Sequence, residues 1–176
     1  MDAAHFVWGT GFLTSVWCFV RMFVRTSSGR KRHNVLGAFN GITKKLLTVV
    51  NDSYINSGSV CEMLRLLRRT HLGEAITVVL DNAAYQRCKL VQGLAEELGI
   101  TLLFLPSYSP NLNLIERLWK FVKKQSLNNC YYETFDDFKS GINACLKNSD
   151  KKYKLQIASL MTLRFQVFKN DQIMAG

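Results

Sequence analysis

The sequence predicts an α/β protein with a mixed sheet, in which an antiparallel meander precedes parallel strands and helices flank the sheet. Three observations predict this class. The first 50 residues have the alternating and turn-rich character of strands, and two fully apolar runs, "ITVVL" and "ITLLFLP", follow with a helical pattern between them. Such a pair forms a parallel βαβ unit buried on both faces. Only helical patterns come after it.

The antiparallel part is predicted from the segment around Trp17–Arg25 and from "VLGAFNGITKKLLTVV". Asn40-Gly41 favours a tight type I′ hairpin turn, because both residues tolerate positive φ. The uncharged stretch Phe6–Val20 has 15 residues, fewer than the roughly 20 needed to span a bilayer. We therefore expect strands there, and no membrane insertion.

The helices are predicted from apolar periodicity and from end signals. Ser59 and Glu62 form a capping-box pattern ahead of a first helix. A second helix is expected over 84–98, where Gly99 ends it. Further helices are expected over "LNLIERLWKFVKKQ", over 134–146, and in the segment after Lys151.

Composition narrows the class of protein and of partner. The chain has 176 residues with 48% hydrophobic and 20% charged content, which predicts one globular domain over 1–176. The formal net charge of +10 suits a polyanion, either nucleic acid or an acidic membrane surface. Five scattered cysteines match neither a zinc spacing nor a disulfide framework, which indicates a reducing, cytosolic compartment.

Asp81 ends the first apolar strand and precedes a helical pattern. The carboxyl edge of a parallel sheet is where ligands of open α/β sheets bind, so Asp81 is a candidate site residue. A strand-to-helix junction is also where Asp serves as a helix N-cap. Both interpretations stand at this point.

Glu116 has a structural and a functional interpretation as well. It completes a capping-box pattern with Asn113 and lies four residues before Lys120, as in a surface ion pair. On a helical wheel, however, Glu116, Lys120 and Lys123 lie beside the apolar stripe that faces the sheet. Carboxylates gathered at a sheet edge bind Mg²⁺ or Mn²⁺, and a pair of such ions activates water for phosphodiester cleavage.

The order of elements is that of a ribonuclease-H-like fold, and three motifs make the likeness specific. They are "DAAHF" at Asp2, "VVLDNAAYQ" around Asp81, and "LLFLPSYSPNLNLIERLWKFVKK" around Glu116, with 34 residues between the last two acids. On these residues the chain resembles the DDE transposases of the mariner superfamily, in the branch carried by bacterial insertion sequences.

The resemblance implies a metal-binding catalytic triad of Asp2, Asp81 and Glu116 that holds Mg²⁺ or Mn²⁺, as two ions. It implies a transposase that cleaves DNA and joins the freed 3′ hydroxyl to target DNA, so that an insertion sequence moves. Expected partners are element-end and target DNA, with a homodimer in the DNA complex. The expected location is the bacterial cytoplasm, at the nucleoid.

The first acid of the triad has a competitor. Asp2 follows a single residue, and chain ends fray unless they are held in a sheet. We expect its strand to form only from His5 onward, which would leave the Asp2 carboxylate mobile. Asp52 ends another predicted strand, "LLTVVND", and only the "DAAHF" match favours Asp2. His5 itself either approaches the site or is a satisfied core residue.

Other residues are candidates for contacts with DNA phosphate, although a charge run is usually a solvated face. Asn82 either orients Asp81 and touches phosphate or simply starts a helix. The phosphate candidates are Asn82, Lys120, Lys123, Lys124, Arg30, Lys31 and Arg32.

The front of the chain departs from the family pattern. Such transposases carry an N-terminal helix-turn-helix region, which we expect to be absent here and to be supplied by a separately encoded part. Two alternatives to an active transposase domain stay open. One is an inactive, truncated remnant that only binds DNA, and the other is a cellular ribonuclease-H-like nuclease.

Overall fold

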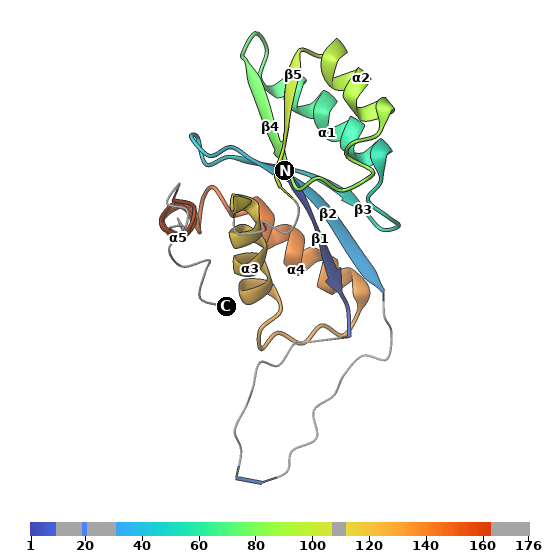
Figure 1. Ribbon diagram of the computed structural model, residues 1–176. Coiled ribbons are helices and arrows are strands. Elements are labelled where there is room, and N and C mark those ends of the chain that lie inside the picture. The colour runs from blue at the N-terminus through green and yellow to red at the C-terminus, as the bar shows by residue number, and fades with distance from the viewer. Residues whose placement is uncertain (10–18, 21–30, 107–111, 163–176) are drawn as a thin grey trace, which may run out of the picture.

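A computed structural model of the chain describes residues 1–9, 19–20, 31–106 and 112–162. Five strands and five helices lie within these residues (Figure 1). In chain order they are β1 (Asp2–Val7), β2 (Arg32–Phe39), β3 (Leu46–Asn51), α1 (Ser57–Thr70), β4 (Ile76–Leu80), α2 (Lys89–Glu97), β5 (Ile100–Phe104), α3 (Leu114–Ser126), α4 (Phe135–Lys147) and α5 (Lys154–Leu160).

The antiparallel meander is confirmed, with β2 between β1 and β3. The predicted type I′ turn at Asn40-Gly41 is wrong, because a longer loop joins β2 to β3. The Asn40 Oδ1 accepts hydrogen bonds from the backbone N–H groups of Ile42 and Thr43, both at 2.9 Å. Asn40 therefore caps the loop with its side chain, as Asn commonly does in turns.

The predicted βαβ unit is also confirmed, since β4 and β5 pair in parallel with α2 between them. Its helix begins later than expected, at Lys89 rather than at Ala84. The backbone N–H groups of Gln86 and Arg87 both bond to the Ala83 carbonyl. These bonds form tight turns before the helix. Of the helix predicted over 84–98, only the part from Lys89 onward is therefore helical.

The helix ends show which capping signals operate. The Asn56 Oδ1 accepts from the Ser59 N–H at 3.2 Å, and the Ser59 Oγ accepts from the Asn56 N–H at 3.5 Å. The capping box of α1 is thus Asn56 with Ser59, and the predicted Ser59 and Glu62 box is wrong by one turn. Thr134 caps α4 as its predicted start implies.

Two hydrophobic cores lie on opposite faces of the β1–β2–β3 sheet. The α1 core joins α1 and α2 to β4 and β5, and the α3 core joins α3, α4 and α5 to β1 and β2 (Figure 1). Along β1, Ala3 packs on the α1 core whereas Ala4 and Phe6 pack in the α3 core. This alternation follows the two-residue period of a strand and shows that β1 is buried from both sides.

Two early predictions fall largely outside the described residues. Most of the expected strand at 17–25 and of the uncharged stretch at 6–20 lies there. No helix among the described residues is long and apolar enough to cross a membrane.

Gly37 of β2 permits an unusually close contact between the sheet and α3. A Cβ added at Gly37 would lie 2.6 Å from the nearest Trp119 ring carbon and 3.0 Å from the Ile115 Cδ1. Both distances are shorter than ordinary van der Waals contact. The indole of Trp119 therefore lies against the bare backbone of β2, which only glycine allows.

We expect Gly37→Ala to lower the free energy of unfolding by about 1 to 3 kcal/mol, because the added methyl group forces Trp119 and α3 away from the sheet. Gly93→Ala is the matched control, since a Cβ at that helical position meets nothing within 4 Å. It should raise stability by up to about 1 kcal/mol. Denaturant unfolding of both variants checks this, and equal effects at the two positions would contradict the packing argument.

Candidate active site

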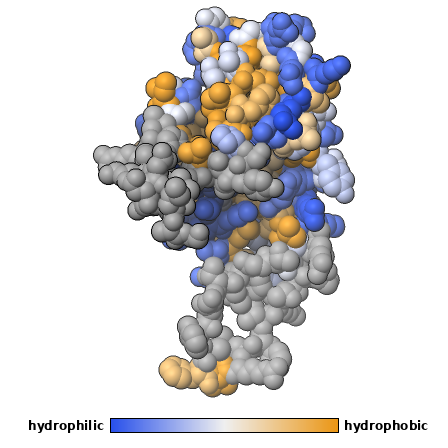
Figure 2. All heavy atoms as spheres, viewed as in Figure 1, coloured by the Kyte–Doolittle hydropathy of each residue, from blue (hydrophilic) through white to orange (hydrophobic). Residues whose placement is uncertain are grey.

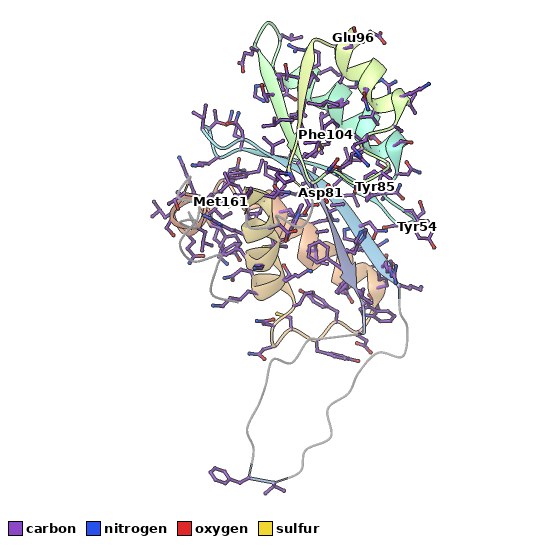
Figure 3. The ribbon with its side chains drawn as sticks, viewed as in Figure 1. Tyr54, Asp81, Tyr85, Glu96, Phe104 and Met161 are labelled. Atoms are coloured by element: carbon purple, nitrogen blue, oxygen red, sulfur yellow. The ribbon has the colours of Figure 1, made fainter. Side chains whose placement is uncertain are left out.

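Asp81 directly follows β4 and is exposed at the carboxyl end of that strand. The alternative that it caps a helix is wrong, because α2 begins at Lys89 and its N-cap is Cys88. An exposed carboxylate at this edge is available to a ligand. Figure 3 labels Asp81 at the end of β4.

Asp2 is the first residue of β1 and only 6% exposed. Its backbone pairs with Gly37, and its Oδ2 accepts a hydrogen bond from the Trp119 Nε1 at 3.1 Å. The amino group of Met1 donates to the Val79 carbonyl of β4 at 2.7 Å. The expectation that this strand starts only at His5 and leaves Asp2 mobile is therefore wrong, since both neighbours hold the chain end in place.

Glu116 lies half-buried in the first turn of α3. Asn113 is the N-cap of this helix, but its side chain makes no capping hydrogen bond, so the predicted capping box with Glu116 is wrong. The ion pairs found among the described residues do not include one between Glu116 and Lys120. Neither structural interpretation of Glu116 is supported.

The carboxylates of Asp81 and Glu116 both act electrostatically on Asp2. Burial, together with the nearby Asp81 and Glu116 carboxylates, raises the pKa of Asp2 to about 6, whereas a hydrogen bond from the Ala3 backbone opposes the rise. Burial also lowers the pKa of the Met1 amino group to about 6, against the attraction of Asp2 and Asp81. The structure thus brings Asp2, Asp81 and Glu116 within electrostatic reach of one another.

Asp52, the competitor for Asp2, lies elsewhere. Its Oδ1 is 3.2 Å from the His33 Nδ1, and its Oδ2 is 3.4 Å from the Lys139 Nζ. The hydrogen bond from His33 is the main cause that lowers the pKa of Asp52. Because Asp52 follows β3, which β2 separates from β1, it belongs to a different cluster from Asp2.

His5 does not share the surroundings of Asp2. It is exposed, and its Nδ1 lies 2.6 Å from the Asn34 Oδ1. Three residues along a strand reverse the direction of a side chain, so His5 and Asp2 lie on opposite faces of the sheet. The structure supports neither a role at the site nor a place in the core for His5.

Asn82 has the left-handed φ of 76° and follows Asp81 directly. Its interpretation as a helix-start residue is wrong, because α2 begins seven residues later. Its Oδ1 is buried without a hydrogen-bond partner among the described residues. A strained backbone and an unpaired oxygen beside Asp81 are typical of functional sites.

The basic candidates divide between two places. Lys120, Lys123 and Lys124 are exposed on α3, the helix that carries Glu116. The Lys31 Nζ lies 5.6 Å from the centre of the Phe135 ring, and Arg32 is exposed. Arg30 lies outside the described residues.

Sequence reasoning missed two residues of this site. Trp119 belongs to the apolar stripe of its helix, yet it also donates the hydrogen bond that orients Asp2. Its spacing of three residues from Glu116 was the available signal. Tyr85 lies beside Asp81 in Figure 3, and burial followed by the charge of Asp81 raises the pKa of its phenol.

The donor set fits a hard divalent cation, because carboxylate oxygens are the ligands that Mg²⁺ and Mn²⁺ prefer. Within the described residues, no group of three or more His, Cys, Asp or Glu side chains is close enough to form a closed metal site. Burial, with the added charges of Asp81 and Glu116, raises the pKa of Asp2, and a bound cation would stabilise the ionised carboxylate against both.

We expect the contribution of Asp2 to the stability of the metal-free protein to fall as the pH rises from about 4 to 7. Asp2 has a folded pKa of about 6 against an ordinary value of 3.8, so the folded state holds its proton more tightly than the unfolded state. Relative to Asp2→Asn, the wild type should lose about 3 kcal/mol of unfolding free energy across this window. Unfolding measured in chelator against pH checks this, and a difference that does not vary with pH would contradict it.

Comparison with known proteins relates this geometry to a family. The family model described as "DDE superfamily endonuclease" matches residues 21–139, a span that contains Asp81 and Glu116 but not Asp2. An uncharacterized protein from Sinorhizobium fredii, y4pE/y4sA, is 34% identical over 65 residues. That alignment covers 37% of this chain and 46% of the relative, so the chain matches less than half of the relative's length.

Solved structures share the fold at low identity. The Mos1 mariner paired end complex with Mn has a TM-score of 0.69 at 12% identity. The match covers 96% of this chain and 55% of the Mos1 chain. The Mos1 strand transfer complex has a TM-score of 0.66 at 15% identity, and the match covers 91% of this chain and 50% of the Mos1 chain. A chain of the simian T-cell lymphotropic virus intasome has a TM-score of 0.58 at 16% identity, and the match covers 86% of this chain and 47% of the intasome chain.

These likenesses confirm the predicted ribonuclease-H-like fold with its mixed sheet. The match to the family model spans well over half of the chain and includes two of the three gathered carboxylates. The chain therefore belongs to the DDE superfamily endonucleases.

Proposed function

We propose that this domain cleaves DNA phosphodiesters and transfers the freed 3′ end to target DNA, as the catalytic domain of a transposase. One observation carries the proposal. Carboxylates from β1, β4 and α3 converge, and the innermost of them, Asp2, is buried among like charges with a raised pKa. A buried carboxylate with two like charges nearby, in a DDE endonuclease domain, suits the binding of divalent cations.

Each residue of the proposed triad has its own part. Asp2 presents a fixed carboxylate, because the Trp119 hydrogen bond and the β1 ladder restrict it. Asp81 is exposed and faces the solvent from which DNA approaches, and Glu116 closes the site from α3. Bound Mg²⁺ or Mn²⁺, as the two ions that the resemblance implies, supplies activation of water and stabilisation of the leaving oxygen.

DNA is the proposed partner, both as element ends and as target. The net charge of +10 favours a polyanion, and the exposed lysines of α3 lie on the helix of Glu116, where they can hold phosphates. The Mos1 structures are paired end and strand transfer complexes, which supports a homodimer on DNA here. A separately encoded part that supplies element recognition, and action at the bacterial nucleoid, complete the proposal.

The alternatives have less support. An inactive remnant was suggested mainly by the expected mobility of Asp2, and that residue is held in a strand and hydrogen bonded. A cellular nuclease of the same fold would use the same carboxylates. The likeness to transposase structures over most of this chain favours transposition.

We expect Asp81→Asn and Glu116→Gln to abolish metal-dependent nicking of DNA, because the amides keep nearly the same shape but lose the charge that holds the cation. Nicking of element-end DNA should be measured in Mg²⁺, in Mn²⁺ and in chelator. A fall of at least about 100-fold is expected for either variant, in line with the loss of a group that stabilises the transition state.

Asp150→Asn and Glu97→Gln are the matched controls, since both acids are exposed and lie outside the proposed site. They make the same change of charge and should leave nicking unchanged. Activity that survives chelation, or that survives either substitution in the triad, would refute the metal-site proposal.

We expect this chain to bind DNA with little sequence preference, because its proposed contacts are basic side chains on phosphates. Phosphate contacts supply affinity, whereas discrimination between sequences needs contacts to base edges. Element-end and scrambled DNA should show similar affinities and similar steep salt dependence. Lys120→Gln should reduce the salt slope by about one, whereas Arg69→Gln, at the end of α1 that leads toward the start of β4, should not. A preference for element ends of about 1000-fold would place recognition within these residues.

A further inference from the structure

The two aspartates of the proposed triad differ in how their side chains are held. The Asp2 carboxylate is buried and accepts a hydrogen bond from the Trp119 Nε1 at 3.1 Å. Asp81 is exposed, and its carboxylate has no hydrogen bond or ion pair among the residues that the structure describes. A carboxylate that binds a metal ion is normally held by a hydrogen bond from a neighbouring group. We therefore searched the surroundings of Asp81 for such a group.

The strands next to Asp81 do not supply it. β4 and β5 have the sequences ITVVL and ITLLF, and apolar side chains gather over the part of the molecule where these strands lie (Figure 2). Their only side-chain donors are the hydroxyls of Thr77 and Thr101, which are paired with one another. Thr77 lies four residues before Asp81, or about 13 Å along the strand. A partner for Asp81 must come from the segment that follows it.

This following segment turns back toward Asp81. Asn82 has a φ of 76°, and the Ala83 carbonyl accepts a hydrogen bond from the Gln86 N–H at 2.9 Å. The left-handed residue and the tight turn reverse the chain directly after β4. As a result, the side chain of Tyr85 lies beside Asp81 (Figure 3).

Tyr85 has a fixed ring and a hydroxyl close to the acids. The half-buried side chain packs against the α1 core. Burial is the main cause that raises the pKa of the Tyr85 phenol, and the charges of Asp81 and Asp2 raise it as well. A phenol with a raised pKa keeps its proton at neutral pH and can donate a hydrogen bond. Tyr85 therefore presents a neutral donor within electrostatic reach of both aspartates.

The residue after Tyr85 is an unusual part of the core. Gln86 is 0% exposed, yet neither its Nε2 nor its Oε1 has a hydrogen-bond partner in the described part of the chain. Its side chain opposes the rise in the pKa of Tyr85, so the amide lies near the phenol oxygen without a well-aligned bond to it. An unpaired buried amide destabilises a folded protein, and an apolar side chain of the same size would not. The amide therefore suggests a role beyond packing.

We propose that Tyr85 is a positioning residue, which donates a hydrogen bond from its hydroxyl to the Asp81 carboxylate when the site holds a divalent cation. In that state the Gln86 Nε2 donates to the Tyr85 Oη and fixes the phenol. The inference rests on the proposed function, because it takes Asp81 as a ligand of the cation. Tyr85 then does for Asp81 what Trp119 does for Asp2. Each aspartate is held by an aromatic side chain, one from the α1 core and one from the α3 core.

The test measures the binding of Mn²⁺ alone, without DNA, by electron paramagnetic resonance. Tyr85→Phe removes only the hydroxyl and should weaken Mn²⁺ binding by at least about tenfold, as the loss of a hydrogen bond to a metal ligand commonly does. Tyr54→Phe is the matched control, because Tyr54 is 73% exposed and follows β3. It should leave Mn²⁺ binding unchanged. Far-UV circular dichroism verifies that all variants are folded.

A double-mutant cycle shows whether Tyr85 acts through Asp81. In an Asp81→Asn background, Tyr85→Phe should change Mn²⁺ affinity by no more than about twofold, because the carboxylate that it positions is already lost. In a Glu116→Gln background, the same substitution should still weaken binding by about tenfold. A tyrosine that only supports the fold would have the same effect in both backgrounds.

Gln86 is tested by effects of opposite sign. Gln86→Met removes the unpaired amide and should raise the midpoint of thermal unfolding in chelator by about 2 to 4 °C. The same substitution should weaken Mn²⁺ binding by at least about threefold, because the phenol loses its own partner. Gln156→Met is the control, since Gln156 is exposed on α5, and it should change neither quantity.

The possible failures can be told apart. If the wild type does not bind Mn²⁺, or if Asp81→Asn leaves binding unchanged, the proposed function and this inference are both overturned. If Asp81→Asn weakens binding but Tyr85→Phe does not, this inference alone is overturned. It is also overturned if Tyr85→Phe weakens binding equally in the Asp81→Asn and Glu116→Gln backgrounds, or if Gln86→Met lowers the unfolding midpoint and leaves Mn²⁺ affinity unchanged.

Discussion

The contact between Trp119 and the bare backbone at Gly37 is the interaction on which the rest of the site depends. It lets α3 approach β2 closely enough for the indole to donate to the Asp2 carboxylate. Glu116 lies one turn earlier on the same helix, so this contact also sets where the third carboxylate stands relative to the first. The packing of α3 against β2 therefore fixes the positions of Asp2 and Glu116 relative to one another.

The site is held in an electrostatically unfavourable state by the fold around it. Asp2 is buried, and its neighbours Asp81 and Glu116 carry the same charge, so its ionised form is costly. Asn82 adds a left-handed backbone and an unpaired oxygen beside Asp81. The two cores supply the stability that offsets this cost, and a bound divalent cation would relieve the same repulsion.

The N-terminal strand connects the two hydrophobic cores and the two parts of the sheet. β1 is buried from both faces, and the Met1 amino group links it to β4 through a hydrogen bond to the Val79 carbonyl. Central strands of α/β sheets are normally the most buried and most fully bonded parts of the fold.

The sequence by itself determined the elements whose signals are local. The apolar runs predicted β4 and β5, the periodicity around Glu116 predicted α3, and strand-end chemistry singled out Asp81. The sequence did not determine the turn after β2, the start of α2 or the cap of α1, because competing side chains and backbone bonds a few residues away decide such boundaries. Only the tertiary structure decided that Asp2, rather than Asp52, lies with the other two acids, and that Trp119 serves the site as well as the core. These outcomes depend on contacts between residues more than 70 positions apart, between Met1 and Val79 and between Asp2 and Trp119, which no local pattern encodes.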